Sequence, residues 1–93
     1  MAILMIAEVE GQTPEKYDTM LAQMGEPMRK AKGFISHLAG PTGDGGWRVI
    51  EVWISEEHAD RFYEERFIPA LRALGLAGTP PVRELWPVHN AMF

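Results

Sequence analysis

The sequence contains no cysteine, which excludes disulfides, thiolate metal ligands and cysteine nucleophiles. Its three histidines show neither the His-x-His nor the His-x-x-x-His spacing of common metal sites. A Gly-x-Ser-x-Gly nucleophile elbow is also missing. We therefore expect no metal site, and any chemistry must use ordinary acids, bases and aromatic side chains.

Long apolar runs and basic clusters are missing as well. No segment approaches the roughly 20 apolar residues of a membrane span. The apolar start lacks a positively charged region and reaches Glu8 too soon for a signal peptide. The formal net charge of −4 argues against nucleic acid and against an anionic membrane surface. We expect a cytoplasmic protein with neither of these partners.

The composition that remains is typical of a globular protein, with 46% hydrophobic and 24% charged residues. A chain of 93 residues is large enough for one hydrophobic core. No internal repeat or low-complexity segment divides it. We expect a single domain over residues 1–93.

Residues 45–58 organise the chain, because they predict a turn, a buried strand and a helix start in succession. Large apolar side chains alternate onto both faces of the strand: Trp47, Val49 and Trp53 on one, Ile50, Val52 and Ile54 on the other. A strand of this kind is covered on both faces. Ser55 ends it and can cap the following helix.

Three further strands and a first helix are predicted around this stretch. The strands are expected over residues 2–9, 34–39 and 82–88. Thr13 and Pro14 are typical of a helix start, and the helix should extend for about 17 residues, with Gly25 and Pro27 disturbing its last turns. The apolar tail, residues 89–93, is expected to be docked.

Helical spacing predicts which residues of the two helices face the core. In the first helix these are Tyr17, Leu21, Met24 and Met28, flanked by Met20. In the second they are Ala59, Phe62, Tyr63, Phe67, Leu71 and Leu74. Pro69 is expected to divide the second helix, and residues 75–81 to form a loop.

The glycine-rich segment 40–46 predicts a long hairpin turn between two strands. If Gly40 faces Trp47 across that turn, Ser36 lies opposite Glu51 and His37 opposite Ile50. A slip of one residue would change both pairings.

The order β-α-β-β-α-β predicts a ferredoxin-like α+β fold, with a four-stranded antiparallel sheet in the order 4-1-3-2 and two helices on one face. The other face is also apolar. Leaving about eight such side chains in water would forgo roughly 1.5–3 kcal/mol each, too much for a small domain. We therefore predict a homodimer through the sheet face that closes into a barrel.

Two stretches resemble the antibiotic biosynthesis monooxygenase (ABM)-like family. Residues 33–37 followed by 46–57 carry most of the resemblance, and residues 87–90 resemble a tail of one subgroup. The resemblance implies a dimeric α+β barrel. It implies no single activity, because that superfamily includes oxygenases, haem-degrading enzymes, isomerases and dehalogenases.

Family members that oxidise polycyclic aromatic substrates without metal or flavin bind them between sheet and helices. The resemblance therefore implies an aromatic slot, and the chain offers side chains for one: Trp47, Trp53, Phe62, Tyr63 and Trp86, with Met20, Met24 and Met28. The alternative is that these residues only fill a core.

Four polar residues are candidates for a role in a site. His37 lies mid-strand, where it can act as a base or as a structural histidine. Glu51 is either a substrate group or half of a pair with Arg48, Arg83, His37 or a tryptophan N–H. Arg48 can clamp an anionic substrate or form an ion pair. His89, with Asn90, suits an interface better than catalysis, and His58 is expected to be solvated.

Haem degradation is not expected. Members of that branch carry an asparagine on the first strand, and a tryptophan and an axial histidine in the second helix. Here Asn90 is the only asparagine, and the helix positions fall near Phe62 and Arg72.

The resulting hypothesis is a cofactor-independent monooxygenase of a small aromatic, phenolic or polyketide-like molecule. His37 and Glu51 are its catalytic candidates; Arg48, Trp53, Phe62, Tyr63, Met24 and His89 are its substrate-binding candidates. The alternatives are a non-oxidative isomerase or cyclase of the same fold, and a non-catalytic small-molecule-binding or assembly domain.

Overall fold

The computed structural model describes residues 2–73 and 83–92. Its elements, in chain order, are β1 (Ile3–Val9), α1 (Pro14–Lys30), β2 (Phe34–Pro41), β3 (Trp47–Trp53), α2 (Glu56–Phe62), the π-helix η1 (Tyr63–Phe67), α3 (Ile68–Ala73) and β4 (Arg83–Pro87). This order confirms the β-α-β-β-α-β prediction. The predictions for Leu74, for the loop 75–81 and for a strand start at Val82 lie outside the described residues.

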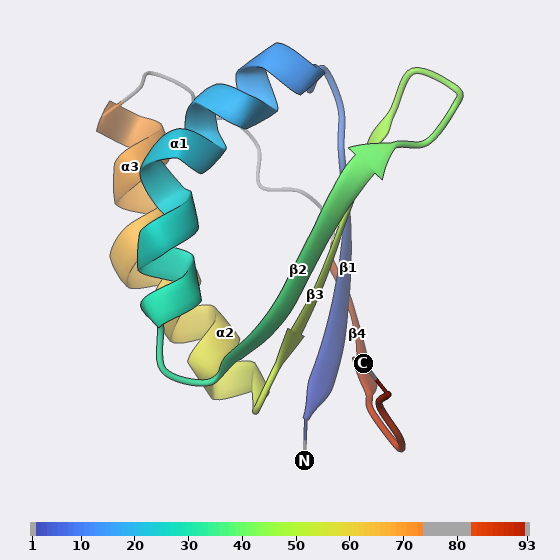
Figure 1. The fold of residues 1–93 in the computed structure, drawn as a ribbon, viewed down its shortest axis with the longest axis vertical. Coiled ribbons are helices and arrows are strands. Elements are labelled where there is room, and N and C mark those ends of the chain that lie inside the picture. The colour runs from blue at the N-terminus through green and yellow to red at the C-terminus, as the bar shows by residue number, and fades with distance from the viewer. Residues whose placement is uncertain (1, 74–82, 93) are drawn as a thin grey trace.

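The four strands form one antiparallel sheet in the order β2-β3-β1-β4, as predicted. Figure 1 shows α1 and the α2–α3 segment on the same side of this sheet. The side chains between sheet and helices form the core, and Trp53 is its most buried large member at 1% exposure.

The predicted register of β2 on β3 is wrong by one residue. Pro41, not Gly40, lies opposite Trp47, so His37 faces Glu51 and not Ile50. The strand extends to Pro41 because the turn is shorter than predicted, closing with a bond from the Thr42 N–H to the Gly46 carbonyl at 3.1 Å. The correction moves His37 to the helix-facing side of the sheet.

A β-bulge interrupts β2 between Phe34 and Ser36. In a regular strand, residues three apart point to opposite faces. The bulge inserts one residue, so Phe34 packs edge-on against Trp53 while His37 also faces the helices.

Helix α1 begins as predicted, with the Thr13 hydroxyl accepting the Lys16 N–H at 3.2 Å. It passes through Pro27 and ends at Lys30, so the expected disturbance does not end it. Its buried residues are Tyr17, Met20, Met24 and Met28. The prediction for Leu21 is wrong, since this side chain lies at the edge of that stripe and is 37% exposed.

Pro69 changes the second helix without breaking it. The Ile68 N–H bonds to the Tyr63 carbonyl, five residues back, within a π-helical turn. A proline lacks the donor for a regular bond and its ring crowds the preceding turn, so the wider turn before it relieves the conflict. Ala59 and Phe62 are buried as predicted, with Phe67 and Leu71 packed against them.

The sheet face away from the helices is apolar and has no cover among the described residues. Leu38, Trp86 and Ile54 on this side are 60%, 57% and 52% exposed. An exposed ion pair, Arg48 to Glu8 at 2.6 Å, lies on the same face. We call this surface the outer sheet face. In the described parts of the chain, no helix is long and apolar enough to cross a membrane.

The C-terminal tail is less docked than predicted. The Val88 N–H donates to the Ala2 carbonyl at 2.9 Å, but residues 89–92 are exposed.

His58 is partly buried and not fully solvated as expected, because its ring packs directly on Gly33. Gly33 has φ +89°, and a Cβ there would lie 2.5 Å from His58 Cγ. The Nδ1 atom of His58 also lies 2.6 Å from the Ser55 hydroxyl. The contact joins the α1–β2 connection to the start of α2.

We predict that Gly33→Ala destabilises the protein more than Gly43→Ala. Both glycines have φ near +90°, but a Cβ at Gly43 meets nothing within 4 Å. Backbone strain should cost about 1–2 kcal/mol in each variant, and the clash with His58 about 1–3 kcal/mol more at Gly33. Urea unfolding measures both; equal losses would contradict the close packing of His58 on Gly33.

Candidate functional site

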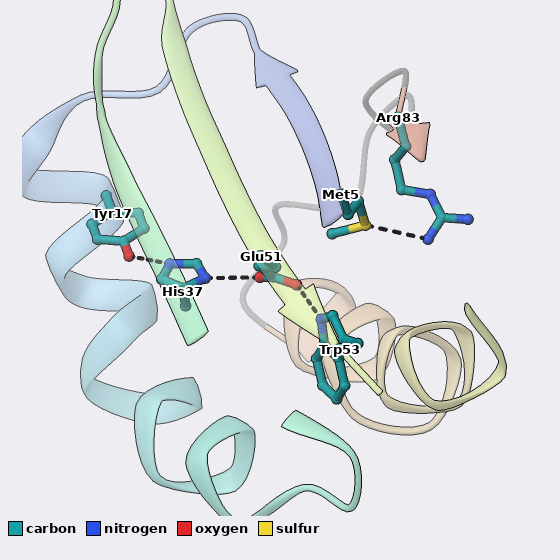
Figure 2. Close-up of polar contacts among 6 residues, drawn as sticks. All are labelled: Met5, Tyr17, His37, Glu51, Trp53 and Arg83. Carbon is teal, nitrogen blue, oxygen red and sulfur yellow. Dashed lines mark hydrogen bonds and ion pairs between the residues drawn. The ribbon is translucent and has the colours of Figure 1, made fainter. Parts of the chain in front are cut away.

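A chain of hydrogen bonds crosses the core between α1 and the sheet. Tyr17 Oη lies 2.5 Å from His37 Nε2, and His37 Nδ1 lies 2.8 Å from Glu51 Oε2. Trp53 Nε1 donates to Glu51 Oε1 at 2.9 Å. Figure 2 shows the four side chains in one line from α1 across β2 to β3. We call this group the Tyr17–Trp53 relay.

The donor at each step follows from the chemistry of the groups. An indole N–H only donates, so Glu51 Oε1 accepts. As a carboxylate, Glu51 also accepts from the His37 Nδ1–H, which leaves the Nε2 lone pair to accept the Tyr17 O–H. The relay therefore holds His37 in the tautomer whose basic nitrogen points at Tyr17.

The sheet register makes this arrangement possible. His37 and Glu51 are directly opposite on neighbouring strands, and Trp53 follows Glu51 by two residues on the same face. Glu51 is 7% exposed, and a buried carboxylate needs donors to replace water. Two donors on one carboxylate meet that need.

Tyr17 is held between two rings. Its ring is parallel to that of His37, with centroids 6.0 Å apart, and lies 5.1 Å from the Trp47 ring. Burial raises the pKa of Tyr17, and the charges of Glu51 and Asp18 raise it further. The phenol is therefore protonated at neutral pH and serves as the donor at His37.

Trp47 has a polar atom that the relay does not use. Its Nε1 is a buried side-chain atom without a hydrogen-bond partner in the part of the chain that is described. Such an atom carries the cost of desolvation unless something accepts from it. It lies in the side chain packed against Tyr17, so it is a donor next to the relay.

The structure brings together three of the residues predicted for a site: His37, Glu51 and Trp53. The open question of Glu51's partner is answered by His37 and the Trp53 N–H. Phe62 packs on Trp53 with ring centroids 5.5 Å apart, and Met24 is buried in the same cluster.

Tyr63, Arg48 and His89 do not join the relay. Tyr63 stacks on Phe67 at 5.1 Å, and burial raises its pKa. Arg48 lies on the outer sheet face, bonded to Glu8. His89 is exposed in the tail.

Two residues were missed as site candidates from the sequence. Tyr17 was expected only to fill the core, although a phenol at a buried position commonly bonds a partner with its hydroxyl. Arg83 was considered only as a partner for Glu51. It instead contacts Met5 Sδ at 3.6 Å (Figure 2). It also donates to Asp60 at 3.1 Å and lies 5.5 Å from the Tyr63 ring centroid.

Neither of two hollows on the surface of the described residues is lined by His37 or Glu51. The larger, about 530 Å³, lies between the end of α1 and the α2–η1 segment. The smaller, about 310 Å³, lies beside Trp47 at the turn end of β1 and β3. Among the described residues, no group of three His, Asp or Glu side chains is placed to hold a metal ion.

No protein-family model and no curated protein sequence matches this chain. Solved structures do. The chain is similar to SnoaB, a cofactor-independent oxygenase from Streptomyces nogalater, with 17% identity over 98% of this chain and 95% of that one and a TM-score of 0.70. It is similar to Rv0793 from Mycobacterium tuberculosis, with 18% identity, coverage of 99% and 100%, and a TM-score of 0.73.

A protein from Caulobacter crescentus, whose proposed activity is that of an antibiotic biosynthesis monooxygenase, is also similar: 17% identity, coverage of 96% and 91%, and a TM-score of 0.73. These likenesses confirm the predicted ferredoxin-like α+β fold of the single chain. At such identities they assign no role to any residue.

We predict that both tyrosines of the native protein have pKa values above the ordinary tyrosine value of about 10. The chain has two, and burial raises the pKa of both Tyr17 and Tyr63. A raised folded pKa contributes stability that is complete below pH 10 and is lost as pH rises through the folded value. Tyrosinate absorbance of the native and the urea-unfolded protein checks this.

The variants Tyr17→Phe and Tyr63→Phe assign the two transitions, and each should remove part of the alkaline loss of stability. Native tyrosines that both ionise at the unfolded value would contradict the burial of the relay's phenol.

Proposed function

We propose that this chain is a cofactor-independent monooxygenase of a small aromatic, phenolic or polyketide-like molecule, with His37 as its general base. The observation that carries the proposal is the buried pair of His37 and Glu51, 2.8 Å apart, whose geometry leaves Nε2 as a lone-pair acceptor. The fold shared with SnoaB, a cofactor-independent oxygenase, supports it.

The proposed reaction begins with proton transfer from a substrate hydroxyl to His37 Nε2. The negative charge of Glu51 offsets the charge of the imidazolium that forms. The substrate anion then gives one electron to O₂, and the resulting substrate radical and superoxide combine at the ring carbon to form a peroxide anion. The His37 imidazolium returns its proton to this anion, which gives the hydroperoxide and restores the neutral base. Loss of water leaves a carbonyl, so a CH₂ group and O₂ become C=O and H₂O.

In the structure, the Tyr17 hydroxyl is bonded to His37 Nε2, the atom that must accept the substrate proton. In the proposed complex the substrate hydroxyl takes the place of the Tyr17 hydroxyl at Nε2. The unpartnered Trp47 N–H, in the ring packed on Tyr17, would then donate to a second substrate oxygen.

The aromatic wall of the proposed site comes from Trp53 and Phe62, with Met24 beside them. Arg48 and His89 lie away from His37 in the same chain, so they enter this proposal only as interface residues.

The same group favours a second candidate, a non-oxidative isomerase or cyclase. A neutral imidazole and a phenol in direct contact form an acid–base pair that needs no oxygen. If the protein catalyses neither oxygenation nor isomerisation or cyclisation, the remaining candidate is a non-catalytic binding or assembly domain.

We also propose that two copies pack through the outer sheet face. Leu38, Trp86 and Ile54 would each gain roughly 1.5–3 kcal/mol by leaving water. A second copy presents the same apolar surface, and a two-fold axis lets each surface cover the other. The pair of sheets would then close into an α+β barrel.

Oxygen consumption with a panel of anthrones and hydroquinones tests the activity. We expect His37→Ala to lower kcat by about 10²–10⁴-fold and Glu51→Gln to lower it less, because an amide still accepts from Trp53 but no longer offsets the imidazolium. Glu10→Gln, at an exposed position, is the charge-matched control.

Equal turnover in both variants and the control would remove His37 and Glu51 from the mechanism. Conversion of a substrate without oxygen uptake would favour the isomerase, and no conversion of any panel member would count against the monooxygenase.

Sedimentation of the protein at micromolar concentration tests the dimer. We expect a dimer, and Leu38→Asp should shift it to monomer because a carboxylate is then buried in the interface. Leu21→Asp makes the same change on the helix side and should leave the dimer intact. A folded wild-type monomer under these conditions would contradict the proposed barrel.

A further inference from the structure

The larger hollow, about 530 Å³, is separate from the relay. It lies between the C-terminal end of α1, the connection after it, and one stripe of α2 and η1. Figure 1 shows this end of α1 beside α2, and the two helices do not pack closely. We call it the interhelix groove. Its volume is within the range of pockets that hold small molecules.

The groove is charged where a helix interface is normally apolar. The lining residues of α2 and η1 follow the spacing of one helical stripe: His58, Arg61, Phe62, Glu65 and Arg66. A stripe that faces a neighbouring helix usually carries apolar side chains that close the gap. Only Phe62 does so here, and the gap stays open.

The charge of the groove is opposite to that of the whole chain. Four basic side chains line it, Lys30, Lys32, Arg61 and Arg66, against two acidic ones, Glu26 and Glu65. This excess of two positive charges lies on a protein of net charge −4. The described residues form no ion pair with Lys32, Arg61 or Arg66, whereas Glu26 already pairs with Arg29 and Lys30.

We propose that the interhelix groove binds an organic dianion, a phosphate monoester on a flat apolar body. Two arginines suit a phosphate because each guanidinium can form two parallel hydrogen bonds to it. Phe62 supplies an aromatic floor for the apolar body. One phosphate matches the excess positive charge.

Fixed walls keep the groove open. The His58 ring is held against Gly33 and lies 2.6 Å from the Ser55 hydroxyl, so it does not fold into the space. Phe62 is held from behind by Trp53, with ring centroids 5.5 Å apart. The site is therefore preformed, and its occupation needs no chemistry at His37.

Titration with 1-naphthyl phosphate, followed by NMR, tests the proposal. The three histidines report on location: the His58 ring signals should move, while those of His37 and His89 stay in place. We expect a Kd below about 1 mM. Arg61→Gln and Arg66→Gln should each weaken binding about fivefold, and added salt should weaken it further.

Three controls make the test specific. Arg72→Gln removes the same charge from an exposed position outside the groove and should leave the Kd unchanged. 1-Naphthol lacks the dianion and inorganic phosphate lacks the apolar body, so both should bind at least about fivefold more weakly.

Several results would overturn the proposal: movement of the His37 signals without those of His58, equal weakening by Arg72→Gln, or equal binding of naphthol or inorganic phosphate. His37→Ala should bind 1-naphthyl phosphate like the wild type. Loss of oxygenase activity and loss of groove binding are therefore independent results.

Discussion

The buried carboxylate of Glu51 is the constraint on which the inner face of the sheet depends. A charge at 7% exposure is stable only with donors in place of water. The Trp53 indole and the His37 imidazole supply them, from the same strand and from the strand beside it. Because the Nδ1 atom of His37 is bonded to Glu51, the Nε2 atom is left, and it bonds Tyr17 from α1. One buried charge thus ties two strands and a helix together.

The same sheet separates two kinds of surface. Its inner face holds the relay among aromatic and methionine side chains, while its outer face exposes apolar residues and the Arg48–Glu8 ion pair. Alternation of side chains along β3 explains the division, since Arg48 and Glu51 are three residues apart and point to opposite faces. An arginine and a glutamate close in sequence therefore have no contact and different roles.

Much of the fold could be predicted from residue pattern, and much of the site could not. Thr13, Pro14 and Ser55 mark helix starts by local chemistry, so the helices begin where predicted. Met20 and Leu21 both lie near the edge of the apolar stripe of α1. Packing against the sheet buries Met20 and leaves Leu21 exposed, and the spacing alone does not distinguish them. Pro69 predicts a disturbance, but whether the chain breaks or widens into a π-turn depends on the packing of both flanking segments. His58 becomes partly buried because Gly33, distant in sequence, presents bare backbone to it.

The sequence alone determined the order of elements, the two-sided apolar strands and the residue types able to act as acid, base and aromatic wall, because each depends on neighbours within a few positions. Only the tertiary structure decided which of them meet. The register of β2 on β3 differs by a single residue from the prediction. This difference places His37 on the helix-facing side of the sheet, opposite Glu51. Tyr17 joins them from a helix. Contacts between segments so far apart depend on how turns, bulges and packing add up, which no local pattern encodes.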